Sequence, residues 1–308
     1  MKTALIIAIN GNFGYQMALA LRDAGWQIKA ILRDAAKAPK WLAPKQVFQG
    51  SASDEKLVAS AANDVDLIVY AANPPYHQWP QLALSMLEPT IRIAIKKRLH
   101  ILFPGNVYNF APQDRPISET GTEAPPTDKG AIRVQMEQRL KAAAQNGAKV
   151  TIIRAGDYMG PNANTTWLHH IVKHSRHSLT LSLPHGEEHL HFWSYLPDVC
   201  ANTVKLLEQS ENAFEVYHDT GFALTADDWK RALASSNQRV RFKRLPWWLY
   251  STIAPFSPLL REVLKMRYLW RETVVLDGSK MKQALGQHMQ QTEFAEVLSA
   301  LSLTEKKA

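Results

Sequence analysis

Cysteine is almost absent from this sequence, which limits how the chain can be stabilised. Cys200 is the only cysteine among 308 residues, so no disulfide can form within one chain. Because 46% of the residues are apolar, a chain of this length can bury a core without such a bond. A lone thiol fits a reducing compartment, and we expect a cytoplasmic protein.

Long apolar runs and low-complexity segments are missing as well. The most apolar stretch, residues 245–260, contains Pro246, Pro255 and Pro258. It is also shorter than the roughly 20 residues that span a bilayer. The 14 glycines and 17 prolines are too few and too scattered for a collagen-like or disordered chain. We therefore expect a compact protein with no membrane partner.

The sequence has no contiguous basic tract, although basic residues outnumber acidic ones. The formal net charge is +8, but the cations are spread over residues 96–98, 239–244 and 261–271. A nucleic-acid partner is therefore not expected. The positive field suits an anionic cofactor or a small-molecule substrate equally well. Nothing in the sequence fixes the oligomeric state, and a homo-oligomer is compatible with it.

Apolar periodicity indicates an α/β protein. Short apolar runs alternate with amphipathic stretches through the first 160 residues, and this is typical of a doubly wound parallel sheet. The predicted strands are 4–9, 27–32, 46–49, 67–71, 101–103 and 150–153, and the predicted helices are 13–24, 81–97 and 132–145. Residues 162–191 predict loops with one helix, and the chain from Leu224 onward is mainly helical. We expect a nucleotide-binding domain over 1–160, also receiving 192–222, and a smaller, mainly helical C-terminal substrate lobe over 161–191 and 223–308.

A glycine loop follows the first predicted strand and opens the first predicted helix. It reads Asn10, Gly11, Asn12, Phe13, Gly14. In this context Gly11 would allow a pyrophosphate to approach the helix N-terminus, and Gly14 would allow close packing of helix on strand. Ala8 stands where a longer glycine motif would have its first glycine, so the alternative is a tight strand-to-helix turn. The flanking strand and helix favour a dinucleotide site.

The end of the second predicted strand bears on which dinucleotide binds. Arg33 comes first, Asp34 follows it, and Lys37 lies one turn further on. An arginine here accommodates the 2′-phosphate of NADP, whereas an acidic residue holds the ribose of NAD. We expect NADP, with NAD the less favoured alternative in which Asp34 takes the ribose.

Several segments together resemble a known family. They are the glycine loop at 8–14, ILRDAAK at 31–37, residues 69–73, 107–108, 154–161 and 195–198, and the late LDGSKMKQALG at 276–286. Their order resembles an atypical or extended short-chain dehydrogenase/reductase of the NAD-dependent epimerase/dehydratase group, which includes the nucleoside-diphosphate-sugar epimerase-like proteins. The resemblance implies a Rossmann-type domain with a substrate lobe. It also implies that Ala71, Ala72 and Asn73 line the cofactor and that residues 156–161 approach the nicotinamide.

The catalytic pattern of that family is missing. In the family a Tyr-x-x-x-Lys pair follows the fifth strand, and a Ser or Thr ends that strand. Here the two matching positions hold Lys129 and Arg133, and no Ser or Thr stands at the strand end. Since a guanidinium stays protonated, Arg133 is expected to position the cofactor by donating to its ribose and not to exchange protons.

Three residues are candidates to replace the missing acid: Lys129, Tyr108 and Tyr158. Lys129 would need burial to lower its pKa, and a solvated lysine in the first helical turn is the favoured alternative. The two tyrosines alternatively serve as aromatic walls of the pocket. We expect an NADP(H)-binding oxidoreductase or epimerase-like enzyme with an altered active site. The alternative is a non-catalytic NADP-binding redox sensor or regulatory protein.

Two further clusters attract attention. His169, His170, His174 and His177 fall in one predicted helix, with His185, His189 and His191 after it, but their spacing matches no zinc motif and no metal is expected. The aromatic segments 246–250 and 266–270 could hold an apolar substrate or a membrane surface. The favoured interpretation is that they form the internal core of the small lobe.

Overall fold

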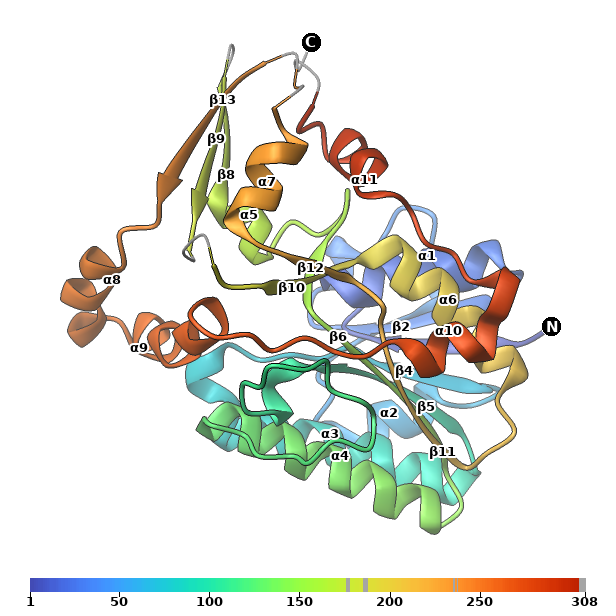
Figure 1. The fold of residues 1–308 in the computed structure, drawn as a ribbon. Coiled ribbons are helices and arrows are strands. Elements are labelled where there is room, and N and C mark those ends of the chain that lie inside the picture. The colour runs from blue at the N-terminus through green and yellow to red at the C-terminus, as the bar shows by residue number, and fades with distance from the viewer. Residues whose placement is uncertain (176–177, 185–187, 235, 237, 305–308) are drawn as a thin grey trace.

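A parallel β-sheet organises the first half of the chain and takes one strand from the second half (Figure 1). The structure is a computed structural model and describes residues 1–175, 178–184, 188–234, 236 and 238–304. Within this range seven strands form the sheet, in the order β11-β6-β5-β4-β1-β2-β3. The strand order reverses between β1 and β4, and such reversals are where doubly wound sheets bind ligands.

The strands follow the predicted apolar runs closely. β2 matches its predicted range, and β3 and β4 lie within theirs. β1 begins one residue earlier than predicted and ends two residues earlier, whereas β5 and β6 extend beyond their ranges. In chain order the strands are β1 Thr3–Ile7, β2 Gln27–Leu32, β3 Val47–Gln49, β4 Leu67–Tyr70, β5 His100–Asn106, β6 Lys149–Ala155, β7 Asp157–Met159, β8 Val172–Ser175, β9 Ser178–Leu183, β10 His191–Tyr195, β11 Phe214–His218, β12 Phe222–Leu224 and β13 Arg239–Arg244.

Helices cover both faces of the sheet, which explains why its central strands are apolar on both sides. Along β1, Leu5 and Ile7 pack with α2, α3 and α4, whereas Ala4 and Ile6 pack with α1, α6 and α10. The helices are α1 Asn12–Asp23, α2 Glu55–Ala61, α3 Trp79–Lys97, α4 Asp128–Gln145, α5 Trp167–Ile171, α6 Leu196–Gln209, α7 Ala226–Ala232, α8 Trp247–Ile253, α9 Pro258–Lys265, α10 Ser279–Leu285 and α11 Phe294–Ala300.

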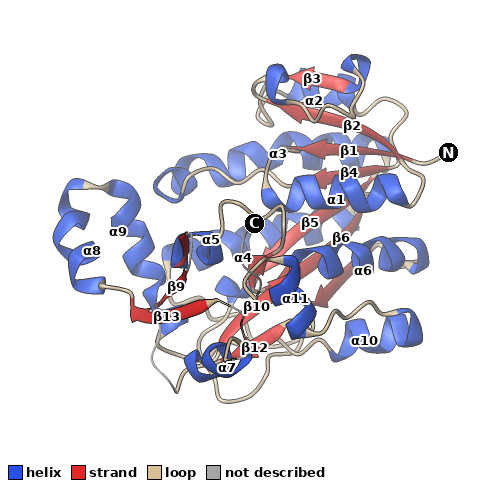
Figure 2. Ribbon diagram, turned by 90° about the horizontal axis from the view of Figure 1, so that it is seen from above, coloured by secondary structure: helices blue, strands red, loops and turns tan. Residues whose placement is uncertain are grey.

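The remaining elements form a lobe beside the carboxyl ends of the sheet strands (Figure 2). It holds two three-stranded sheets, in the orders β12-β10-β7 and β13-β9-β8, together with α5, α7 and α11. Its core is rich in tryptophan, with Trp193, Trp229 and Trp270 each at most 1% exposed. The expected Rossmann-type doubly wound sheet with a smaller C-terminal lobe is therefore confirmed.

The prediction for residues 162–191 was wrong in detail. Among the described residues of this stretch only α5 is an α-helix, and His174 lies on β8, which pairs antiparallel with β9. In β9, Leu179, Leu181 and Leu183 are buried in alternation, as expected of a half-buried strand. The alternating pattern of β9 was missed because it is short and is flanked by polar residues and histidines. His177 and His185 lie outside the described residues.

The prediction that both aromatic segments form internal core is also only half right. Trp247 and Trp270 are 8% and 1% exposed and pack inside the lobe. Trp248, the next residue after Trp247, is 71% exposed. A helix presents neighbouring residues to different sides, so one tryptophan is buried by the lobe and the other faces away from it.

Candidate functional site

The loop between β1 and α1 has an unusual backbone at its start. Ala8 has a φ of +65°, in the left-handed region that glycine adopts most easily. Its carbonyl accepts a hydrogen bond from the Gly11 amide at 3.0 Å, which closes the turn. A Cβ on Gly14 would lie 2.6 Å from that same carbonyl oxygen. Gly14 is therefore the position where α1 meets the loop too closely for a side chain.

Gly11 differs from Gly14 because space is open around it. A Cβ there would meet only the backbone oxygens of Ala8 at 3.4 Å and Ala71 at 4.0 Å. Gly11 is also the N-cap of α1, and no side chain caps this end of the helix. Amide donors of the first turn thus lack intrahelical acceptors and carry the positive end of the helix dipole. This uncapped end lies at the reversal of strand order, and the arrangement fits the pyrophosphate of a dinucleotide.

Neighbouring segments close around the glycine loop. Phe13 stacks on Tyr158, with ring centroids 6.1 Å apart, so Tyr158 packs against the first turn of α1. Thr165 Oγ1 lies 3.1 Å from the Asn12 side-chain oxygen and donates a hydrogen bond to it. On the other side, the Ala71 amide donates to the Ile7 carbonyl at 3.2 Å, which places the start of residues 71–73 beside the loop. Asn10 is exposed at the start of the turn.

At the end of β2 the acidic and basic residues have different surroundings. The Asp34 carboxylate caps a short 3₁₀ helix, Ala35–Lys37, by accepting from the Ala36 amide at 3.1 Å. It also lies 3.5 Å from the Lys37 ammonium. Arg33 is exposed and, within the described ranges, has no assigned hydrogen bond or ion pair. The guanidinium is thus the more available of the two groups.

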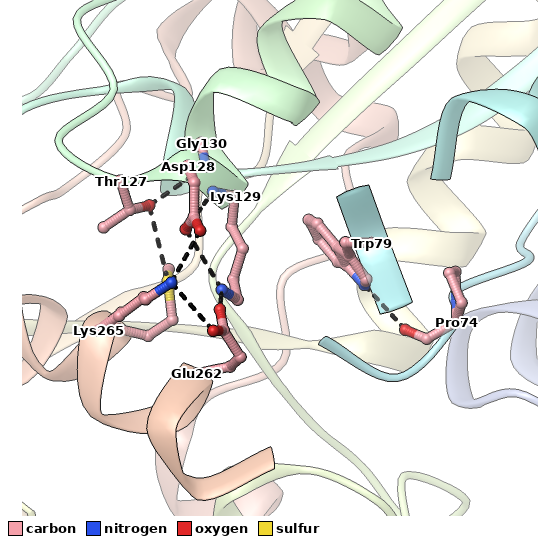
Figure 3. Close-up of polar contacts among 9 residues, drawn as sticks. Pro74, Trp79, Thr127, Asp128, Lys129, Gly130, Glu262 and Lys265 are labelled. Atoms are coloured by element: carbon pink, nitrogen blue, oxygen red, sulfur yellow. Dashed lines mark hydrogen bonds and ion pairs between the residues drawn. The ribbon is translucent and has the colours of Figure 1, made fainter. Parts of the chain in front are cut away.

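Lys129 is not the solvated residue that we expected from its position in the first turn of α4. It is 1% exposed, and its ammonium forms ion pairs with Asp128, at 3.3 Å, and with Glu262 of α9 (Figure 3). Lys265 lies 2.9 Å from each of the same two carboxylates. Burial lowers the pKa of Lys129, and Asp128 opposes that shift. No sequence pattern predicted that α9 would cover this position.

Arg133 lies one turn after Lys129 and is 9% exposed. Its guanidinium donates to the Pro104 carbonyl at 3.1 Å and lies between the rings of Trp79 and Phe103, about 5 Å from each centroid. The Nε atom is buried without a hydrogen-bond partner among the described residues. The Arg133 guanidinium is thus held in place, and its Nε–H remains available to donate a hydrogen bond.

Two phenols share a hydrogen bond at the carboxyl end of β5. The hydroxyls of Tyr76 and Tyr108 are 2.7 Å apart, and Trp79 packs against both rings. Two hydroxyls contain two protons, but the bond between them uses one. No other bond to either hydroxyl is found within the described ranges, so one O–H is available to an outside acceptor. Tyr76 was missed because it stands in a proline-containing loop with no motif.

Burial raises the pKa of both paired tyrosines and of Tyr158 above the usual range. The charge of Asp157 adds to the rise in each case. These phenols therefore remain protonated at neutral pH. They can donate a hydrogen bond, or give a proton to a strongly basic oxygen, but they do not act as bases.

Asp157 is held by a histidine of the small lobe. His191 Nε2 lies 2.7 Å from the Asp157 carboxylate, and His191 Nδ1 lies 3.0 Å from the Leu269 carbonyl. The His191 ring stacks on Trp270, with centroids 3.4 Å apart and planes 5° from parallel. Asp157, His191 and Trp270 thus link strands β7 and β10 of the lobe to residues 266–270.

Trp270 also lines a cavity of about 270 Å³. Cationic and aromatic side chains dominate its wall, which includes Arg244, Arg267, Arg271, Trp247 and Trp270. Arg267 lies over the Trp247 ring, 4.8 Å from its centroid, and its Nε is buried without a hydrogen-bond partner among the described residues. The cavity is therefore suited to an anionic ligand that also offers an apolar or aromatic surface.

The histidine cluster is not brought together. His169 and His170 are exposed on α5, His174 is exposed on β8, and His191 is paired with Asp157. Within the described ranges, no group of three or more His, Cys, Asp and Glu residues is placed to hold a metal ion.

A buried carboxyl group that belongs to no sequence motif directly follows β11. Asp219 is 3% exposed, and its Oδ2 lacks a hydrogen-bond partner among the described residues. Burial raises the pKa of Asp219 to about 6, although Ser194 and the amides of Thr220 and Gly221 oppose the rise by hydrogen bonding. Because it directly follows β11, Asp219 could have been noticed only once β11 was known to join the main sheet.

Comparisons with known proteins agree on the fold. No protein-family model and no curated protein matches the chain. Solved structures do match: MoeE5 in complex with UDP-glucose and NAD, at 14% identity, covers 97% of each chain with a TM-score of 0.74. WbmH from Bordetella bronchiseptica in complex with NAD+, at 18% identity, covers 98% of each chain with a TM-score of 0.69.

A third solved structure is the terminal R domain of the myxalamid PKS-NRPS biosynthetic pathway. It is 17% identical over 98% of this chain and 90% of that chain, with a TM-score of 0.73. At these identities the similarity shows the fold alone. It confirms that the resemblance noted in the sequence extends to the architecture of nearly the whole chain.

The raised pKa of Asp219 predicts a pH-dependent stability. The folded state binds the Asp219 carboxyl proton more tightly than the unfolded state does. This proton therefore contributes to the free energy of unfolding at low pH, and the contribution is lost as the pH rises through about 6. A shift of about two pH units corresponds to roughly 3 kcal/mol. We expect Asp219→Asn to gain about that much stability over wild type between about pH 4 and pH 8. Denaturant unfolding across this range measures the difference.

Asp23→Asn is the matched control, because the Asp23 side chain is 67% exposed. This variant should follow the wild-type pH profile. Parallel profiles for Asp219→Asn and wild type would contradict the assignment of a raised pKa to Asp219.

Proposed function

We propose that this protein binds NADP(H) at the β1–α1 loop and acts as an oxidoreductase or epimerase-like enzyme whose proton donor is displaced from the usual position. The observation that carries the cofactor proposal is the open space at Gly11 in front of an uncapped helix, at the reversal of strand order. MoeE5 and WbmH, which share the fold, have NAD in their solved complexes. That agreement supports a nicotinamide dinucleotide here.

The cofactor's parts would meet different groups of this chain. The pyrophosphate would lie over Gly11 and accept from the amides of Asn12 and Phe13, with Gly14 keeping α1 close. Ala71, Ala72 and Asn73 would line its middle, and Arg133 would donate to the nicotinamide ribose. When bound, the nicotinamide would accept or supply a hydride.

The preference for NADP over NAD is supported by how Asp34 is used. Its carboxylate caps a 3₁₀ helix and faces Lys37, so it is less available to accept from ribose hydroxyls. Arg33 is exposed beside it and would bind the 2′-phosphate, with Lys37 adding positive charge.

For the proton, the paired phenols are better placed than Lys129. Lys129 is held by Asp128 and Glu262, and releasing its proton would leave two carboxylates facing a neutral amine. Of the Tyr76 and Tyr108 hydroxyls, one has a proton to donate, and each phenol can relay to the other. We therefore assign the proton donor to this pair. Tyr158, packed on Phe13, is the aromatic wall of the cofactor site.

The substrate would be a small anionic molecule. The cavity beside Trp270 offers three arginines and two tryptophans, which would bind phosphate or carboxylate groups together with an apolar or aromatic moiety. MoeE5 has UDP-glucose in its solved complex, and a nucleotide sugar has this combination of groups.

A second function, a non-catalytic NADP-binding sensor, is favoured by one observation. The positions of the family's catalytic pair are filled by Lys129 and Arg133, and both are fixed by contacts within the protein. A chain that only reports bound cofactor would tolerate this replacement. The two functions differ in whether a hydride passes between the bound cofactor and a substrate.

Replacing Gly11 by valine tests the cofactor site. The new side chain would occupy the space left for the pyrophosphate, so we expect NADPH binding to be abolished in calorimetry. Folding should survive, since the Cβ meets its nearest atom at an ordinary 3.4 Å. A thermal unfolding curve similar to wild type is therefore the control. Unchanged NADPH affinity in the folded variant would remove the cofactor proposal.

Replacing Arg33 by alanine tests the preference for NADP. A charge-assisted contact to a phosphate contributes about 1.5 to 3 kcal/mol, so NADPH affinity should fall about tenfold or more while NADH affinity is almost unchanged. Lys40→Ala, another exposed cation in the segment after β2, is the control. Equal affinity of wild type for the two cofactors would refute the preference.

Replacing Tyr108 by phenylalanine tests the proton donor. The variant keeps the ring but breaks the pair, so we expect kcat to fall about 100-fold or more, with NADPH affinity unchanged. Tyr70→Phe is the matched control, because the Tyr70 hydroxyl is buried without a hydrogen-bond partner among the described residues. If Tyr108→Phe retains full turnover while Lys129→Met loses it, the lysine is the acid.

A further inference from the structure

The large apolar side chains exposed on this protein are concentrated in one short segment. Apart from Met1, those in the described residues are all within 248–259: Trp248, Leu249, Ile253, Phe256 and Leu259. Trp248 is 71% exposed and Phe256 is 88% exposed. Isolated exposed apolar residues need no explanation, but five within twelve residues mark an interaction surface. We call residues 247–265, comprising α8, the turn and α9, the apolar tip.

The apolar tip is firmly attached at its base, so its exposure is not that of a frayed end. Trp247 Nε1 donates to the Pro184 carbonyl at 2.8 Å, and Arg267 covers the Trp247 ring. Glu262 of α9 pairs with the buried Lys129. Figures 1 and 2 both place α8 and α9 at the outer edge of the molecule, away from the main sheet. The tip therefore projects from the molecule while its two ends are fixed.

Most of the net charge of the protein lies in the chain segment that contains this tip. Residues 239–271 contain eight basic residues and one acidic residue, a net charge of +7 out of +8 for the whole chain. Arg239, Arg241 and Lys243 are exposed along β13, which leads directly into α8. The one acidic residue, Glu262, is neutralised by Lys129 and Lys265. A target of this surface must combine negative charge with an apolar interior.

We propose that the apolar tip docks this protein on the surface of an anionic lipid bilayer. Trp248, Phe256 and their apolar neighbours would enter the boundary between headgroups and acyl chains. The exposed cations that lie outside the arginine-lined cavity would contact the anionic headgroups, namely Arg239, Arg241, Lys243 and Arg261. Tryptophan is favoured at this depth. None of the helices in the described part of the chain has the length and apolar character to cross a bilayer. The contact is thus peripheral, and it reverses the expectation of a protein without a membrane partner.

A second copy of the chain is the less favourable occupant. Pairing two tips would bring together two copies of residues 239–271, each with a net charge of +7, and like charges across an interface oppose association. Nucleic acid would satisfy the cations but offers no apolar phase for five exposed apolar side chains. A bilayer containing anionic lipid satisfies both features at once.

Co-sedimentation of the full chain with lipid vesicles tests the proposal. We expect the wild type to pellet with phosphatidylcholine vesicles containing phosphatidylserine. Binding should be at least tenfold weaker to vesicles of phosphatidylcholine alone. It should also weaken at high salt, because salt screens the attraction between the cations and the anionic headgroups. The double variant Trp248→Ser, Phe256→Ser should lose at least about tenfold in partitioning, since two large apolar side chains no longer insert.

Charge variants give a matched comparison. Arg239→Glu with Arg241→Glu should weaken vesicle binding at least about tenfold, whereas Lys45→Glu with Lys141→Glu, the same charge change on exposed residues elsewhere, should weaken it much less. NADPH binding by every variant shows that the fold is intact, and it separates this proposal from that of the cofactor site.

Three outcomes would overturn the proposal. The first is no pelleting of wild type with phosphatidylserine vesicles. The second is equal pelleting of wild type and the Trp248→Ser, Phe256→Ser variant. The third is a dimer, seen by light scattering without lipid, that the same variant dissociates, because the tip would then be covered by a second copy.

Discussion

The ion pair between Lys129 and Glu262 is the contact on which the arrangement of the site depends. An ammonium that is 1% exposed must be paired, because removing the partner of a buried charge costs about 3 to 5 kcal/mol. The partner comes from α9, 133 residues further along the chain, so the same bond fastens the C-terminal lobe to the first turn of α4. The position that carries a tyrosine in the resembling family therefore serves here to join two parts of the protein.

Because Lys129 is held in ion pairs, the proposed proton donor must be another residue. Arg133 keeps its proton, and Lys129 keeps its own while two carboxylates face it. The Tyr76 and Tyr108 pair remains, with a surplus proton and pKa values raised by burial. Asp157 contributes to these shifts, and it is in turn held by His191, which stacks on a wall of the arginine-lined cavity. A residue of the lobe thus contacts both the carboxylate that influences the two phenols and a side chain of the cavity wall.

The sequence was sufficient for six of the seven strands of the main sheet and for the glycine loop because these depend on local patterns. Apolar runs such as residues 4–9 and 27–32 predict buried strands directly, and Gly11 and Gly14 stand where a strand passes into a helix. Features made by distant segments were not predictable in the same way. The burial of Lys129 requires α9, and the burial of Asp219 requires β11 to join β6. Tyr76 gains its role only through Tyr108, and the exposure of Trp248 follows from which side of α8 meets the lobe.

The most direct test of the central claim, a working NADP(H) site with a displaced proton donor, uses the wild-type protein. NADPH-loaded protein is mixed with a panel of aldehydes, ketones and nucleotide sugars, and the near-ultraviolet absorbance of the reduced nicotinamide is followed. The account predicts that the absorbance falls with at least one anionic aldehyde, ketone or keto nucleotide sugar, or that the NADP+-loaded protein interconverts a nucleotide sugar with its epimer. Tight cofactor binding with neither change would contradict it and leave a protein that only binds the cofactor.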